Sequence, residues 1–94
     1  MRAQTKIVVD KQREGEFRVT VVEGTTETAH TVTVDDGYYE KLTGRKVPVE
    51  ELVRRSFEFL LEREPKESIL RTFALPVIGR YFPEYERDMR RRLA

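Results

Sequence analysis

The 94-residue sequence predicts a small α+β protein, in which a short antiparallel β-meander of about three strands packs against a bundle of about four helices. β-branched and alternating residues fill the first third of the chain, helical signals begin at Asp35, and prolines then divide the rest into short segments. The length favours one domain over 1–94. The meander would occupy 1–34 and the helices 35–94.

The strands are predicted from β-branched runs that are separated by turn residues. Lys6–Val9 reads as a first strand, the polar stretch Asp10–Gly15 as a turn, and the alternating stretch Glu16–Val22 as a second strand. Gly24-Thr25 places glycine first in a two-residue loop, as a type II′ hairpin turn requires. The strand pattern then ends near Val34.

The hairpin turn predicts the register of the second and third strands. Pairing Glu23 with Thr26 keeps the apolar side chains on one face, whereas a shift by one residue would scatter them. The pairs that follow are Val21 with Thr28, Val19 with His30, and Phe17 with Val32.

Two helices are predicted after the hairpin. Asp35-Asp36 is an N-cap signal for a helix that stops at Gly44. Pro48 suits the first position of a central helix, which should end before Pro65. Its amphipathic stripe comprises Val49, Leu52, Val53, Phe57, Leu60 and Leu61.

Prolines divide the C-terminal third of the chain. We expect short helices over Lys66–Phe73 and Pro76–Phe82, followed by a longer helix that starts at Pro83. One apolar stripe crosses the last break and comprises Ile78, Phe82, Tyr85, Met89 and Leu93.

Composition excludes several classes of protein. With 38% hydrophobic and 37% charged residues and a net charge of +1, the chain is not of the disordered type and has no general attraction to nucleic acid. The absence of cysteine excludes thiolate catalysis and disulfides. No apolar run approaches the roughly 18 residues of a membrane span, so we expect a cytoplasmic protein with no membrane partner.

The basic residues of the chain are mostly arginine. This preference fits a heat-adapted source and a GC-rich genome equally well.

No set of residues predicts catalysis. His30 is the single histidine, and its place in the strand alternation favours a half-buried structural imidazole over a catalytic one. Asp35 and Asp36 with Glu40 are explained by helix capping better than by a metal site. No phosphate-binding or nucleophile motif occurs, so neither an enzyme nor a cofactor is expected.

Arginines near the C-terminus offer a nucleic-acid alternative. Basic side chains grouped in this way can contact phosphates. The candidate contacts are Arg80, Arg87, Arg90, Arg91 and Arg92.

Two observations weaken this alternative. Acidic residues precede three of the arginines at helical ion-pair spacing, in the pairs Glu84–Arg87, Glu86–Arg90 and Asp88–Arg92, which favours a solvated helix face. A helix-turn-helix around Phe73–Leu75 would have Pro76–Phe82 as its recognition helix, but that segment is mostly apolar.

An aromatic cluster and one short strand supply the remaining interaction hypotheses. Tyr81, Phe82 and Tyr85 could stack on bases or dock a peptide, although rings at this spacing more often belong to a core. The strand Ile7–Val9 would lie at a sheet edge if the strands follow chain order, and an unpaired edge favours a homodimer.

The helical half resembles a group of small uncharacterised prokaryotic proteins. The resemblance is carried by Ser56–Pro65 (SFEFLLEREP), Glu67–Leu70 (ESIL) and Tyr81–Tyr85 (YFPEY) within 47–86. It implies a shared fold and no assigned activity. The leading functional hypothesis is therefore a non-catalytic protein-interaction module, with an unknown partner or a second copy, and the alternative is a nucleic-acid-binding accessory protein.

Overall fold

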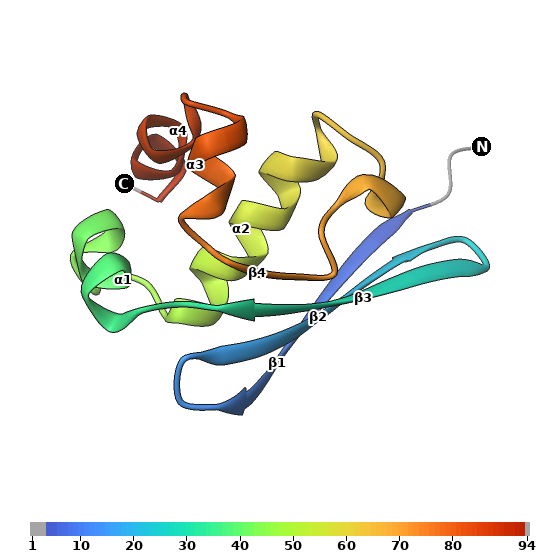
Figure 1. Ribbon diagram of the computed structural model, residues 1–94, viewed down its shortest axis with the longest axis horizontal. Helices are drawn as coiled ribbons and strands as arrows, with labels where there is room; N and C mark the ends of the chain where they lie inside the picture. Colours follow the sequence, from blue (N-terminus) through green and yellow to red (C-terminus); the bar gives the residue numbers. More distant parts are fainter. Residues whose placement is uncertain (1–3, 94) are drawn as a thin grey trace.

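The computed structural model describes residues 4–93, which form a twisted sheet with the helices gathered on one of its faces (Figure 1). The strands are β1 (Thr5–Arg13), β2 (Glu16–Glu23), β3 (Thr26–Thr33) and β4 (Thr72–Ala74). The helices are α1 (Asp36–Thr43), α2 (Val49–Leu61), the 3₁₀ turn η1 (Lys66–Ser68), α3 (Val77–Tyr81) and α4 (Tyr85–Arg92).

The α+β class is confirmed, but the sheet is larger than predicted and is of mixed type. Its strand order is β1-β2-β3-β4. The first three strands form the expected antiparallel meander, and β4 joins β3 in parallel. The prediction of a purely antiparallel sheet of about three strands is therefore wrong in the number of strands and in the direction of the last one.

The hairpin between β2 and β3 has the predicted register. Glu23 pairs with Thr26, and the pairs continue down to Phe17 opposite Val32. Gly24 has φ +60° and Thr25 is not among the positive-φ residues, which fits a type II′ turn. As a result, Phe17, Val19, Val21 and Val32 are all buried on the face toward the helices.

The first strand extends further than Lys6–Val9. β1 continues to Arg13 with an irregularity between Lys11 and Arg13, so the turn before β2 is only two residues long. Polar side chains at these positions are tolerated because this end of the strand is exposed to solvent.

Both helices that follow the hairpin lie close to their predicted bounds. The Asp35 side chain caps α1 by accepting a hydrogen bond from the Tyr38 amide, and Gly44 ends the helix at φ +61°. Pro48 is the N-cap of α2 rather than its first residue. The stripe of α2 is buried as expected, with Leu52, Val53, Phe57 and Leu60 in the core.

The predicted helix over Lys66–Phe73 does not form. After the single turn η1, the chain becomes extended and adds β4 to the sheet. Two local features explain the difference: Phe73 and Leu75 are buried while Thr72 and Ala74 are exposed, which is the alternation of a strand, and Pro76 disfavours helical dihedrals at Leu75. A helix-turn-helix around Phe73–Leu75 is excluded because its first helix is a strand.

The last two helices are shorter than predicted, and their stripe is buried in part: Ile78, Tyr85 and Met89 lie in the core, whereas Phe82 and Leu93 are partly buried. α3 begins at Val77, and α4 begins at Tyr85 instead of Pro83. Inside the core, the Tyr85 hydroxyl donates to Ser56 Oγ (2.6 Å), which in turn donates to the Leu52 carbonyl (2.7 Å). None of the helices between residues 4 and 93 is long and apolar enough to cross a membrane.

Candidate functional site: an apolar cleft beside the fourth strand

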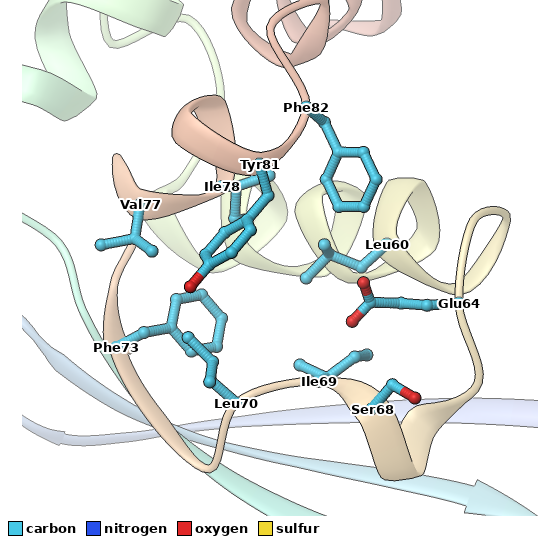
Figure 2. Close-up of a pocket in the computed structure, with 10 residues that line it drawn as sticks. All are labelled: Leu60, Glu64, Ser68, Ile69, Leu70, Phe73, Val77, Ile78, Tyr81 and Phe82. Atoms are coloured by element: carbon cyan, nitrogen blue, oxygen red, sulfur yellow. The ribbon is translucent and has the colours of Figure 1, made fainter.

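A cleft with a volume of about 140 Å³ opens where α2, α3 and the segment from η1 to β4 meet (Figure 2). Its walls come from consecutive segments of the chain, from the end of α2 through η1 and β4 to α3. We refer to it as the β4 cleft. It is lined by Leu60, Glu64, Ser68, Ile69, Leu70, Phe73, Val77, Ile78, Tyr81 and Phe82.

The rim of the β4 cleft carries two exposed apolar side chains. Leu70 is 47% exposed and Tyr81 is 66% exposed, whereas Ile69, Phe73 and Ile78 beneath them are buried. Leu70 and Tyr81 are also the only large hydrophobic side chains classed as exposed among residues 4–93. Both of these side chains therefore lie at one site, and such a concentration is typical of a binding surface.

The rim at Leu70 is fixed to the sheet by His30. The Leu70 carbonyl can only accept, so His30 Nδ1 carries the proton and donates to it (2.8 Å). His30 Nε2 then accepts from the Thr28 hydroxyl (2.8 Å). Burial of the imidazole lowers the pKa of His30 below its ordinary value. This favours the neutral ring, in which both nitrogens are hydrogen-bonded. His30 is therefore buried rather than half-buried as expected from the sequence, and it positions the rim of the cleft.

A buried lysine holds the other end of the same segment. Lys66 in η1 is only 4% exposed, and its Nζ contacts Glu67 (2.7 Å) and Glu23 at the hairpin (3.1 Å). Its pKa is raised, first by the hydrogen bond to Glu67, so the ammonium is retained despite its burial. Lys66 and His30 together hold the segment in front of α2.

One charged side chain points into the β4 cleft. The Glu64 carboxylate lies between Leu60 and Ile69 (Figure 2). Burial raises the pKa of Glu64. Among residues 4–93, no side chain forms a hydrogen bond or an ion pair with this carboxylate.

The basic neighbours of Glu64 in the sequence are engaged elsewhere. Arg63 turns away to Glu84 (Nε to Oε2, 3.1 Å) and stacks on Phe59, with Cζ 3.5 Å from the ring centroid. Lys66 is held by Glu23 and Glu67. Glu64 is therefore a partly buried carboxylate that forms no ion pair within the part of the chain that the structure describes.

The strand beside the cleft has a free edge. The Thr31 amide donates to the Arg71 carbonyl (2.7 Å) and the Leu75 amide donates to the Thr33 carbonyl (2.9 Å). Because backbone groups alternate in direction along a strand, Thr72 and Ala74 direct theirs away from β3. Within the described part of the chain, nothing pairs with these outward groups.

A second hollow of about 420 Å³ lies between the β1–β2 turn and α1, and its charged side chains already have partners, since Asp35 accepts from the Tyr38 amide and the others form ion pairs. Lys11 contacts Glu14 (2.7 Å), and Arg45 binds both Asp36 and Glu40 (3.0 Å to Glu40). This hollow therefore has no charged group that lacks a partner in the way that Glu64 does.

None of the arginines predicted to contact nucleic acid lines the β4 cleft, although Arg80 lies on α3, which supplies part of the lining. Arg80 is exposed on α3, and Arg87, Arg90 and Arg91 are exposed on α4. Arg92 is instead held by Asp88 (2.9 Å) and Glu62.

The ion pairs expected around these arginines are partly formed. Asp88–Arg92 is present, but Glu84 contacts Arg63. Glu86 accepts from the Tyr38 hydroxyl (2.9 Å) and lies 3.7 Å from Lys41. The acidic residues of α4 therefore hold the helix to its neighbours more than they screen its arginines.

Other chemistry-bearing residues have structural roles. Asp35 caps α1, and the Ser56 hydroxyl is fully buried beneath Tyr85. Over residues 4–93, no three histidine or carboxylate side chains come together in a way that could hold a metal ion.

The aromatic cluster Tyr81, Phe82 and Tyr85 divides between two roles. Tyr85 is core and Phe82 is half-buried, while Tyr81 is exposed at the cleft rim. Sequence reasoning missed Glu64, Leu70 and Lys66 as parts of a site, because it predicted a helix over Lys66–Phe73 where the chain forms η1 and β4. Comparison of the chain with protein-family models, with curated proteins and with solved structures found no match.

Proposed function

We propose that this protein is a non-catalytic protein-interaction module that binds an extended segment of a partner protein at β4. The observation that carries the proposal is the juxtaposition of a free strand edge with an apolar cleft whose rim is exposed. An extended segment added to β4 would satisfy the outward backbone groups of Thr72 and Ala74. A side chain of that segment, on the same sheet face as Phe73, would enter the β4 cleft.

The rim supplies apolar surface for such a contact. Full burial of a leucine-sized side chain contributes about 1.5–3 kcal/mol, and Leu70 and Tyr81 both have surface left to bury. The bound segment must also be ordered, which opposes binding. A short peptide should therefore bind weakly to moderately, as is common for recognition by strand addition.

The arginine surface gives less support for the nucleic-acid alternative. Arg92 is engaged with Asp88 and Glu62, and Asp88 also lies 3.9 Å from Arg91. The exposed arginines Arg80, Arg87 and Arg90 line neither the β4 cleft nor the hollow beside α1. Nucleic-acid binding therefore ranks second among the proposed functions.

Peptide display tests the proposed function without a known partner. A random peptide library is selected on the immobilised protein, and the selected peptides are then measured against Tyr81→Ala and Leu70→Ser. Both substitutions are on exposed side chains, so the fold should persist while binding is lost.

Val22→Ser is the matched control for the rim variants. Val22 is also a partly exposed apolar residue, but it points to the sheet face opposite the buried Val21. We expect its peptide binding to equal that of the parent protein. The proposal fails if no peptide is enriched, or if the rim variants bind the selected peptides as well as the control does.

A further inference from the structure

We propose that the β4 cleft is a lysine-side-chain site, in which apolar and aromatic walls hold the stem and the Glu64 carboxylate receives the ammonium. This inference rests on the proposed function, because the lysine would belong to the segment that pairs with β4. It adds the chemistry by which that segment is recognised.

The charge of the cleft selects a cation. Glu64 is the only charged residue in the lining. Neither Arg63 nor Lys66, its nearest basic neighbours in sequence, turns toward it. An apolar side chain seated over Glu64 would bury the carboxylate further without a partner, which is unfavourable, and an anion would be repelled.

The walls of the cleft suit the rest of a lysine side chain. Leu60 and Ile69 flank the carboxylate, and a lysine can lay its four-carbon stem along such apolar surface while its charged end reaches an acceptor. Phe73, Tyr81 and Phe82 present rings around the same opening (Figure 2). Aromatic rings grouped around a cationic side chain add a favourable electrostatic contact.

The position of Glu64 favours a long side chain over a short one. In Figure 2 the carboxylate enters from the side of the cleft opposite Phe73, which is the residue supplied by β4. A segment paired with β4 must therefore reach across the cleft to meet it. A lysine has the length to do so and carries a compact charge that one carboxylate can satisfy.

The test repeats the peptide selection on the parent protein and on Glu64→Gln in parallel. Glutamine keeps the size of the side chain and removes its charge. On the parent protein we expect lysine to be enriched at one fixed position of the selected peptides. On Glu64→Gln we expect methionine or leucine at that position instead.

A matched peptide pair then measures the effect. One selected peptide is synthesised with lysine and with norleucine, which has a similar apolar stem and no charge. The lysine peptide should bind the parent protein about tenfold more tightly, as expected for one charge-assisted hydrogen bond, and the preference should disappear on Glu64→Gln.

The outcomes separate this inference from the proposed function. If both proteins select the same apolar residue, or if the norleucine peptide binds the parent protein as tightly, the lysine site is overturned while the protein-interaction module stands. If no peptide is selected on either protein, both are overturned.

Discussion

His30 shows how one side chain can connect the sheet to the rim of the β4 cleft. It lies in β3, donates to the Leu70 carbonyl at the cleft rim and contacts the Phe57 ring of α2 at 5.4 Å between centroids. Its alternation position identifies it as structural, but its bond to Leu70 spans 40 residues and cannot be predicted from local pattern. The histidine therefore links strand, helix and rim.

We predict that His30 makes stability depend on pH near neutrality. The folded state lowers the pKa of His30 below 6.5, so the unfolded chain takes up the proton more readily. The stabilising contribution is complete above about pH 6.5 and is lost as the pH falls below that value. His30→Gln should be less stable by about 1–3 kcal/mol at high pH, with the gap narrowing toward pH 5. Urea unfolding at several pH values measures this, and parallel curves for the two proteins would contradict it.

Arg92 and Arg90 are neighbours on α4 with different environments. Arg92 bonds to Asp88 and Glu62 and is 24% exposed, whereas Arg90 is exposed. Arg92→Gln should cost about 0.5–1 kcal/mol of stability, and Arg90→Gln should remain within about 0.5 kcal/mol of the parent protein. Thermal melts of the two variants check this. A loss for Arg92→Gln no larger than that for Arg90→Gln would show that the ion pairs of Arg92 do not stabilise the fold.

At the scale of elements, the β2–β3 hairpin is the part that the sequence predicts most completely. Glycine in a two-residue loop, together with strict alternation on both sides, leaves one register that keeps the apolar face intact. The strand β4 could not be predicted in this way, because three residues are too few to show the alternation of apolar and polar side chains that identifies a strand. Its pairing depends on β3 being in place to receive it.

The hairpin turn gives a prediction with its own control in the adjacent residue. Gly24 has φ +60°, a value that a β-branched residue adopts only with strain, whereas Thr25 does not have positive φ. Gly24→Val should destabilise the fold by about 1–3 kcal/mol, and Thr25→Val should have little effect. Equal melting temperatures for the two variants would show that the turn is not strained by a side chain at Gly24.

The first strand is an edge, and α2 covers part of it. The register of the hairpin leaves the backbone groups of Ile7 and Val9 directed away from β2. Arg54 on α2 donates to the Ile7 carbonyl (3.2 Å), which blunts the edge at that point. The homodimer expected from the sequence stays a proposal, and Arg54 is the residue that would oppose it.

Self-association is a property of the whole molecule, and measuring it tests whether Arg54 protects the edge of β1 from pairing with a second copy. Removing the Arg54 side chain in Arg54→Ala frees a carbonyl on the edge, so association between copies should strengthen. Sedimentation at matched concentrations of the parent protein and the variant should show a larger average mass for the variant. Identical sedimentation would contradict a role of this edge in dimer formation.

Across the whole molecule, the fold is more predictable from sequence than the site. The spacing of Phe57 and Leu60 predicts a buried helix face, because the residues on one face of a helix recur every three or four positions in the sequence. The β4 cleft is formed by α2, η1, β4 and α3. Glu64 stands out as a candidate binding residue only because its basic neighbours Arg63 and Lys66 form ion pairs with other residues. Such a site depends on tertiary contacts that leave no periodic trace in the chain.

The most direct test of the account is a map of where a display-selected peptide touches the protein. Amide chemical shifts of the ¹⁵N-labelled chain are followed during titration with that peptide. Binding at β4 predicts that the largest changes fall on Leu70, Thr72, Ala74 and Tyr81, around the free edge of β4 and its cleft. Changes centred instead on the exposed arginines of α4, or on the outer face of the sheet around Val22, would contradict it.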